Sequence, residues 1–546
     1  MTEPSSEQAA VIAYNGSAVV SARPGSGKTF TMTRMIAKAS EDLLSYQGVI
    51  AISYTRKASA ELRGRCVSLG VEPRLSFYGT IDGFCLGIII KQFFSHVVGS
   101  KADLRVLDED DVLPDGLEAL GEDWVDRRCD RWDLIKRAFS LGILPVSALS
   151  EAAYCMAVHV PAVRAFLRAR YTAVFIDEYQ DCRLSQHMLM LELVGLGLRG
   201  VAFGDLDQSI FAYNGSSPIY LSELIQNPEF RTFSITENRR CHKSIVDYSL
   251  KLLGGDIQPA TDSDKRVVLV NMSGDEASIA ACIRDRVDAI CECYGLEGRN
   301  EVALLCTANH MIDRYARLLN VPFKRFSDTR LDKGFGLSRK FFAELIALLY
   351  TRCGYSGDLI DTYLPPDSRT RENLCAKEIV EDLMSVSDDR WGREIESFLQ
   401  LEDMCLGKCD DAAAHDDLDE VLNNLDELRH GYRPASPEEV NLLTYYKAKG
   451  LEFDAVFCLD CYEYIMPPYK YEQNTLYDAR QQSLNLHYVG LTRARKVCYI
   501  PLAKWRHNAS DEPKKAQPSQ FLSLPGLAEL RQEVAWRLLD DISAET

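Results

Sequence analysis

The stretch Ala22-Arg23-Pro24-Gly25-Ser26-Gly27-Lys28-Thr29 stands between an apolar run at residues 18–21 and a helical pattern that starts at Phe30. Glycines let backbone N–H groups approach a phosphate closely, and the N-terminus of the following helix favours negative charge. Lys28 would reach the β- and γ-phosphates of a nucleoside triphosphate, and the hydroxyl of Thr29 would hold Mg²⁺. The strict phosphate-loop pattern has glycine where this chain has Ala22, but the strand–loop–helix context supports a nucleotide site.

Short β-branched runs recur along the chain, and each is followed by a turn and a helical pattern. Apolar strands that alternate with helices are typical of parallel sheets covered on both faces. The predicted strands lie at residues 18–21, 49–54, 173–176, 201–203, 267–271, 302–306, 455–459 and 497–501. They suffice for two sheets, at residues 1–240 and 241–502, so the expected fold class is α/β.

Two carboxylates follow the predicted strand at residues 173–176. Asp177 and Glu178 stand at its C-terminal end, which is where open α/β sheets place functional groups. Asp177 would coordinate Mg²⁺, and Glu178 would polarise the attacking water as a general base. A solvated turn would look the same in isolation, but Lys28 upstream favours a catalytic pair. Gln208, after the next strand, could sense the γ-phosphate.

Two stretches interrupt the alternation of strands and helices. Residues 91–170 and 341–433 are both predicted to be helical, and each would be an insertion into one of the two sheet domains. The candidate core residues of the first insertion are Trp124, Trp132, Leu134 and Phe139.

The end of the chain is predicted to form an amphipathic helix. Residues 507–520 are rich in Ser, Pro, Lys and Asp and suggest a linker. Residues 527–539 follow it, with Leu530, Val534, Leu538 and Leu539 on one helical face. Docking on the parent lobe is the expected role of this helix, and docking on a partner is the alternative.

Composition indicates a soluble cytoplasmic protein of three or four domains that has no membrane association. The net charge is −18, which argues against coating nucleic acid through bulk charge but allows a local basic groove. Seventeen cysteines are scattered, and the CxxC pair Cys458 and Cys461 lacks a matching second pair. Reduced core thiols are therefore favoured over a zinc or iron–sulfur site.

The order of the motifs resembles that of superfamily 1 DNA helicases of the UvrD, Rep and PcrA type, over nearly the whole chain. The matching segments are Gln8 and residues 22–29, 54–58, 79–84, 177–181, 204–215, 238–240, 444–453 and 488–495. The resemblance implies two RecA-like P-loop NTPase lobes with two small helical insertions, the 1A, 1B, 2A and 2B plan. The implied division is lobe 1A at 1–90 and 171–240, insertion 1B at 91–170, lobe 2A at 241–340 and 434–546 with the C-terminal helix, and a reduced insertion 2B at 341–433.

The same resemblance assigns roles at an ATP site. Gln8 would read adenine, Arg240 would contact the γ-phosphate, and Arg493 would be an arginine finger from the second lobe. The catalytic residues would be Lys28, Asp177, Glu178, Gln208, Arg240 and Arg493. The ATP-binding residues would be Gln8, Ala22, Gly25, Ser26, Gly27, Lys28, Thr29, Arg239 and Glu452. Arg239 replaces the aromatic residue that stacks on adenine in the family, and a guanidinium can also lie on a π-face.

Single-stranded DNA is the implied substrate, with 3′→5′ movement. The residues implied to contact it are Tyr54, Arg56, Lys57, Thr80, Tyr213, Tyr446 and Lys449. Stacking is favoured for Tyr213 and, more narrowly, Tyr54, whereas Phe84 is expected to be a core residue. Several family residues are replaced: Asp82 and Tyr446 stand where histidines are usual, and Tyr213-Asn214 replaces a tryptophan–arginine pair. The ATP site is therefore the firmer of the two assignments.

The short insertions and the variant at residues 79–84 also resemble the GajB subunits of Gabija anti-phage defence systems. That narrower resemblance implies a hetero-oligomer with a GajA-type Toprim nuclease. Three functions stay open. The first is a translocase or helicase in a defence complex. The second is a sensor ATPase of DNA ends or nucleotide state that unwinds little. The third is a free-standing UvrD-like repair helicase, which the acidic balance and small size disfavour.

Overall fold

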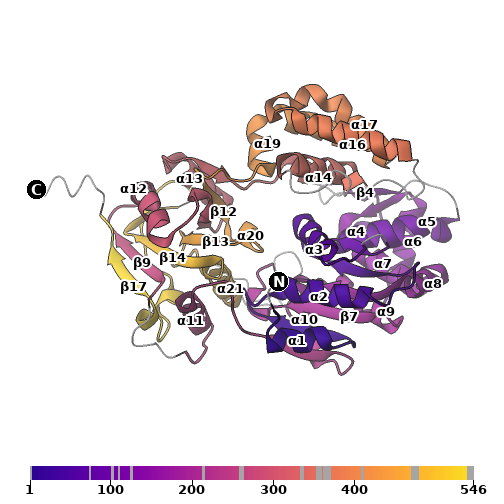
Figure 1. The fold of residues 1–546 in the computed structure, drawn as a ribbon, viewed down its shortest axis with the longest axis horizontal. Helices are drawn as coiled ribbons and strands as arrows, with labels where there is room; N and C mark the ends of the chain where they lie inside the picture. Colours follow the sequence, from indigo (N-terminus) through magenta and orange to yellow (C-terminus); the bar gives the residue numbers. More distant parts are fainter. Residues whose placement is uncertain are drawn as a thin grey trace, which may run out of the picture.

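Two α/β lobes lie side by side, and a separate group of helices lies above them (Figure 1). The computed structural model describes residues 3–72, 75–99, 104–107, 111–122, 124, 127–211, 216–257, 264–332, 337–351, 359–360, 370–406, 411–468, 479–508 and 510–537. All eight predicted strands are present, and the α/β fold class is confirmed.

The first lobe is built on a six-stranded parallel sheet in the order β3-β2-β6-β7-β1-β8. Its strands are β1 (Ala18–Ala22), β2 (Gly48–Ile52), β3 (Phe77–Gly79), β6 (Tyr171–Ile176), β7 (Arg199–Gly204) and β8 (Arg231–Ile235). The strands are apolar on both faces: Val19 belongs to one core cluster and Val20 to the other. This fits a parallel sheet with both faces covered.

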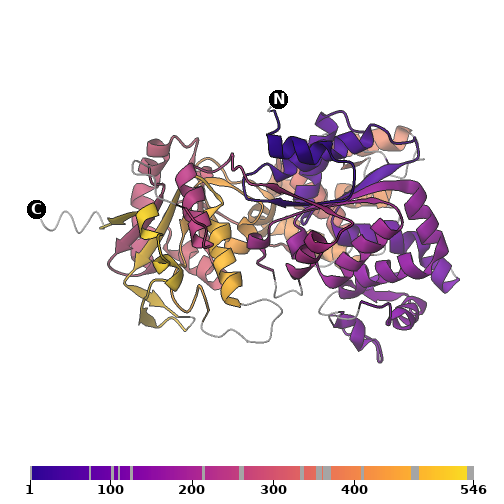
Figure 2. The ribbon, with the colours of Figure 1, turned by 90° about the horizontal axis from the view of Figure 1, so that it is seen from below.

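Helices cover both faces of this sheet, as two perpendicular views show (Figures 1 and 2). They are α1 (Ser6–Ala13), α2 (Lys28–Ser40), α3 (Arg56–Ser68), α4 (Ile81–Phe84), a π-helical segment (Cys85–Ile90), α5 (Lys91–Val98), α9 (Leu184–Gly195) and α10 (Ile219–Gln226). The continuous stretch Ile81–Val98 is long and apolar enough to cross a membrane. It packs into the first lobe instead, with Phe84, Ile89 and Ile90 fully buried.

Residues 91–170 are mostly helical but share the core of the first lobe. Besides α5, they form α6 (Trp132–Ser140), α7 (Leu149–His159), α8 (Pro161–Arg170) and a small parallel pair, β4 (Arg105–Leu107) with β5 (Ile143–Pro145). Phe139 is fully buried and Trp124 is 9 % exposed, whereas Trp132 and Leu134 pack at the margin of the core.

The second lobe is built on a seven-stranded parallel sheet in the order β11-β12-β10-β13-β14-β9-β17. Its strands are β9 (Val267–Met272), β10 (Val302–Cys306), β11 (Phe323–Arg325), β12 (Val440–Thr444), β13 (Phe453–Cys458), β14 (Ala494–Ala503) and β17 (Gln532–Ala535). The helices around it are α11 (Lys243–Leu252), α12 (Glu276–Tyr294), α13 (Asn309–Leu318), α20 (Tyr445–Ala448) and α21 (Ala479–Leu491). A hairpin of β15 (Trp505–His507) and β16 (Pro513–Lys515) follows β14.

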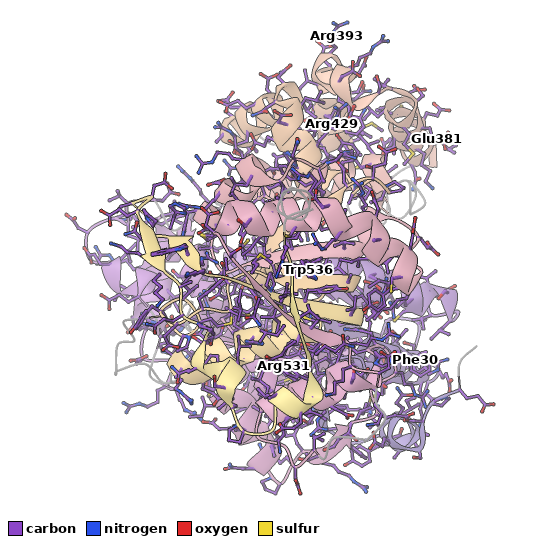
Figure 3. The ribbon with its side chains drawn as sticks, turned by 90° about the vertical axis from the view of Figure 1, so that its left-hand side faces the viewer. Phe30, Glu381, Arg393, Arg429, Arg531 and Trp536 are labelled. Atoms are coloured by element: carbon purple, nitrogen blue, oxygen red, sulfur yellow. The ribbon has the colours of Figure 1, made fainter. Side chains whose placement is uncertain are left out.

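The predicted C-terminal helix at residues 527–539 is wrong. Residues 528–530 form one 3₁₀ turn, and β17 then pairs in parallel with β9, placing Val534 opposite Val270. Trp536, which is labelled in Figure 3, follows this strand. Its ring lies 5.5 Å from that of Tyr499, and the guanidinium of Arg286 lies over it. Leu538 and Leu539, which the prediction placed on the helical face, lie outside the described residues.

The group of helices above the lobes has a hydrophobic core of its own. It comprises α14 (Leu337–Thr351), α16 (Thr370–Ser385), α17 (Ile395–Leu406), α18 (Ala412–Asn423) and α19 (Leu425–Tyr432). Asp388 ties it together, accepting hydrogen bonds from the hydroxyl of Tyr350 and from the guanidinium of Arg429. Its two ends meet where the hydroxyls of Thr329 and Tyr432 lie 2.8 Å apart.

Candidate ATP site and DNA-facing surface

The phosphate loop joins β1 to α2, and two of its glycines are structurally required. Gly25 and Gly27 have φ values of +70° and +82°, in the left-handed region that favours glycine. A Cβ at Gly25 would lie 2.8 Å from Cβ of Arg240, and one at Gly27 would lie 2.5 Å from Nε2 of Gln8. Ala22 ends β1 and is only 1 % exposed, so a methyl group fits where the strict pattern has glycine.

The two predicted catalytic carboxylates follow β6 and face Lys28. The N–H of Asp177 donates to the carbonyl of Ile52 at 2.9 Å, which keeps this residue at the sheet edge. Glu178 has a φ of +53°, a strained conformation for a residue with a side chain, and such strain clusters at functional sites. Nζ of Lys28 lies 3.3 Å from Oδ1 of Asp177 and pairs with Glu178.

Burial and charge act in opposite directions on these three groups. Burial would lower the pKa of Lys28, but Asp177 and Glu178 outweigh it and raise that pKa above its ordinary value. Burial would raise the pKa of Glu178, but Lys28 and Lys449 lower it to about 2. Burial dominates at Asp177 and raises the pKa of its carboxyl, against the opposing charge of Lys28. Glu178 is therefore ionised near neutral pH, as a general base must be.

Two further buried carboxyls complete an acidic cluster, and their pKa values are raised. Burial raises the pKa of Asp181 to about 6 and that of Asp205 to about 6. Oδ1 of Asp181 has no hydrogen-bond partner among the described residues. Carboxylate and hydroxyl oxygens are the ligands that Mg²⁺ prefers. The unpartnered oxygen of Asp181 and the carboxylates of Asp177 and Glu178 are thus oxygen ligands of the kind that Mg²⁺ uses.

Lys449 lies at this acidic cluster rather than on an open surface. Its side chain is 6 % exposed, pairs with Asp181 and lies 3.9 Å from Oε2 of Glu178. It also donates to the carbonyl of Gln208 at 2.8 Å. The predicted DNA contact of Lys449 stays a prediction. Because the acidic cluster belongs to the first lobe, Lys449 links the two lobes at the nucleotide site.

Arg493 and Gln208 meet across the boundary between the lobes. Arg493 follows α21, is 3 % exposed and donates from Nη2 to Oε1 of Gln208 at 3.2 Å. Nε2 of Gln208 donates in turn to Oδ2 of Asp205 at 2.7 Å. Backbone carbonyls of Val489 and Leu451 hold the guanidinium in place. Burial, and next the charge of Arg240, lower the pKa of Arg493 to about 10.

The other residues assigned to ATP surround the phosphate loop. Arg240 lies beside Gly25 and pairs with Glu452. Gln8 is buried, accepts from the N–H of Ser5 and donates to the carbonyl of Ser26, so its amide braces the loop. Arg239 is exposed and pairs with Glu237, outside the loop.

The residues assigned to DNA are partly brought together. Tyr54 is 41 % exposed at the end of β2, and Tyr446 lies on α20 of the second lobe. Arg56 and Lys57 are the first residues of α3. Thr80 caps α4, because its hydroxyl accepts from the N–H of Gly83 at 3.2 Å. Tyr213 lies outside the described residues.

Phe211 joins these aromatic residues and was missed in the sequence. Its ring stacks on Tyr54 at 5.1 Å and lies 6.0 Å from the ring of Tyr446. The ammonium of Lys449 lies 5.0 Å from the centre of the same ring. In the sequence, the only indication of a role for Phe211 was its position between Gln208 and Tyr213. A row of contacts therefore runs from the acidic cluster to the exposed Tyr54.

Comparisons with known proteins match the chain to one family of helicases. The model of the UvrD/REP helicase N-terminal domain matches residues 3–141 and 129–229, and that of the UvrD-like helicase C-terminal domain matches residues 376–504. ATP-dependent DNA helicase UvrD1 of Mycobacterium tuberculosis is 23 % identical, over 97 % of this chain and 85 % of the relative. DNA helicase II of Haemophilus influenzae is 24 % identical, over 94 % and 85 %. Gabija protein GajB of Bacillus cereus is 28 % identical, over 44 % of this chain and 47 % of GajB.

Proposed function

We infer that this chain, which belongs to the UvrD/Rep-type helicase family and is an ATP hydrolase of that class, moves 3′→5′ on single-stranded DNA by opening and closing its two lobes. The observation that carries this proposal is the contact of Arg493 with Gln208. An arginine from a second lobe stabilises charge on a transferring phosphoryl only when the lobes are closed. Hydrolysis would then alternate with lobe movement.

The paired side chains give the chemistry a defined order. ATP would place its phosphates on the N–H groups of the loop and draw Lys28 away from Glu178. Glu178 would lose its strongest partner, become more basic and activate the attacking water. Thr29 and Asp177 would hold Mg²⁺, which neutralises charge on the β- and γ-phosphates. Gln208, Arg240 and Arg493 would surround the γ-phosphate.

The coupling of ATP to DNA would run through Lys449 and Phe211. The ammonium of Lys449 pairs with Asp181 of the acidic cluster and also lies 5.0 Å from the centre of the Phe211 ring. Phe211 in turn stacks on the exposed Tyr54, and Tyr54 would stack on a base. The anionic phosphates of an incoming nucleotide would compete with the acidic cluster for Lys449 and change the support under these rings. Arg56 and Lys57, at the start of α3, would bind phosphates of the strand.

Single-stranded DNA is expected to stimulate ATP hydrolysis by the purified chain. The reason is the row of contacts that links Tyr54 to the acidic cluster. A coupled ATPase assay would compare single-stranded DNA, blunt duplex and no DNA at equal nucleotide concentration. A fluorescent strand-displacement assay in the same buffer would separate a translocase from a sensor ATPase. A rate that is indifferent to DNA would contradict the motor, and stimulation by ends without displacement would favour the sensor.

The second part of the proposal is a place in an anti-phage defence complex. The match to GajB supports it, together with the compact helical group of the second lobe. The partner would be a GajA-type Toprim nuclease in a hetero-oligomer, so a nuclease gene beside this one is expected. Co-expression of both proteins should give one peak in size-exclusion chromatography. Two separate peaks would leave a free-standing repair helicase as the better description.

A further inference from the structure

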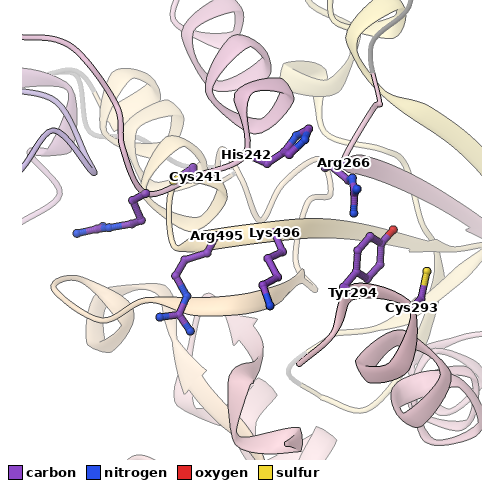
Figure 4. Close-up of a pocket in the computed structure, with 8 residues that line it drawn as sticks. Cys241, His242, Arg266, Cys293, Tyr294, Arg495 and Lys496 are labelled. Carbon is purple, nitrogen blue, oxygen red and sulfur yellow. The ribbon is translucent and has the colours of Figure 1, made fainter. Parts of the chain in front are cut away.

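The second lobe carries a basic pocket of about 370 Å³ that shares one arginine with the ATP site. Figure 4 shows its lining side chains. The lining includes Arg240, His242, Arg266, Tyr294, Arg495 and Lys496. Arg240 and His242 precede α11, Arg266 precedes β9, Tyr294 ends α12, and Arg495 and Lys496 begin β14. Three separate segments of the chain therefore bring cations to one place, and a fourth brings Tyr294.

The charged side chains that line the pocket are all cationic, in a chain whose net charge is −18. Among the described residues that line it, four are lysine or arginine and none is aspartate or glutamate. Two carboxylates outside the lining pair with two of these cations: Asp454 lies 2.6 Å from Arg495 and 2.8 Å from Lys496, and Glu301 also pairs with Arg495. A cavity lined by one sign of charge concentrates ligands of the opposite sign.

The two remaining cations have partners that a bound anion can replace. Arg240 pairs with Glu452, whose side chain is 41 % exposed, and Arg266 pairs with Asp264, which is 55 % exposed. Exposed ion pairs of this kind contribute little net energy, because water screens them. An anion held by several of the cations together would outcompete each single carboxylate.

We propose that this pocket binds a phosphate-bearing ligand. Arginine forks match the geometry of phosphate oxygens, and three of the four cations are arginines. The volume lies in the range of small-ligand pockets. Tyr294 adds an aromatic ring, with the guanidinium of Arg266 4.8 Å from its centre. The phosphate is carried either by a free nucleotide or pyrophosphate, or by the 5′ end of a DNA strand.

Arg240 makes the pocket a regulator of the ATP site, and this part rests on the proposed function. The same side chain lies beside Gly25 of the phosphate loop and at the edge of the pocket. A ligand that draws Arg240 into the pocket removes one positive charge from the γ-phosphate. Occupancy of the pocket therefore slows ATP turnover.

Calorimetric titration with inorganic pyrophosphate tests the site directly. The protein is the full chain with Lys28→Ala, so that the phosphate loop contributes little binding. Adding Arg266→Gln and Lys496→Gln should weaken pyrophosphate binding at least tenfold. The matched control is Arg299→Gln with Lys514→Gln, which removes the same charge elsewhere on this lobe; Arg299 and Arg266 side chains are both 25 % exposed. The proposed site is overturned if the pocket substitutions and the control substitutions weaken pyrophosphate binding equally, or if no pyrophosphate binding is detected.

Two further arms identify the source of the phosphate and test the link to ATP. A 5′-phosphorylated oligonucleotide is compared with the same strand bearing a 5′-hydroxyl. Tighter binding of the phosphorylated strand that is lost with Arg266→Gln and Lys496→Gln (the pocket pair) assigns the pocket to strand ends. Equal binding of the two strands assigns it to free phosphates. In the chain with Lys28 intact, pyrophosphate should inhibit ATP turnover less once the pocket pair is replaced. Unchanged inhibition overturns the regulatory link alone. The calorimetric titration measures pyrophosphate binding without ATP hydrolysis, so its result can be interpreted even if the proposed function fails.

Discussion

Lys28→Ala is expected to lower the kcat for ATP hydrolysis by about 10³-fold or more. Its ammonium is the charge that would follow the phosphates, and here it lies between Asp177 and Glu178. Its loss also leaves two buried carboxylates without their main counter-ion, which would repel an incoming triphosphate. The measurement is steady-state turnover with saturating single-stranded DNA and ATP.

Lys38→Ala is the matched control for this variant. It lies on the same helix, and its ammonium donates to the carbonyl of Ala13 at 2.8 Å, away from the acidic cluster. Turnover within about twofold of the parent chain is expected for it. A Lys28→Ala protein that keeps its circular dichroism spectrum and hydrolyses ATP at a near-normal rate would show that the catalytic site lies elsewhere.

The second large effect is expected from Arg493→Ala, with kcat lowered by about 10³-fold and ATP affinity changed little. The arginine would act on charge that develops only during phosphoryl transfer, so the loss should be in turnover rather than binding. Fluorescent-nucleotide titration and turnover, measured on one preparation, separate the two. Losing the donors to Gln208 and Leu451 should cost about 1–3 kcal/mol of stability, which thermal unfolding checks.

Arg493→Lys is the sharper comparison. It keeps a positive charge but not the fork that reaches Gln208 and the carbonyls of Val489 and Leu451 together. Only a small part of the lost turnover should return. Full recovery would mean that charge alone suffices, and a large rise in the Kd for ATP in Arg493→Ala would mean that the residue binds the ground state.

Much of the fold followed from local sequence patterns. Buried parallel strands are continuous apolar runs, so residues 302–306 were placed at the bounds of β10, and seven other strands within a few residues. The C-terminal helix was wrong because Leu530 and Val534 are four residues apart, a spacing that also suits a turn followed by an edge strand. Pairing with β9 decided between the two, and that pairing is not a local property of the sequence.

The candidate site shows the same division between local and distant information. Lys28, Asp177 and Glu178 stand beside strand ends of one sheet, so their meeting could be expected from topology. The contact of Lys449 with Asp181 was not expected from the sequence, because it depends on how the two lobes meet. Phe211 carries no motif signature of its own. Its importance is visible only in the folded chain, where Tyr54 and a second distant segment with Tyr446 and Lys449 surround it.

The helical group above the lobes has a consequence for how such chains change over time. Because it has its own core, and because its ends meet at Thr329 and Tyr432, the chain leaves the second lobe and returns to it at one place. Segments connected in this way can be lengthened, shortened or exchanged without disturbing the sheet beneath. A lineage could thus acquire a new attachment for DNA or for another protein by rebuilding these helices alone, while the ATP-hydrolysing machinery stays as it was.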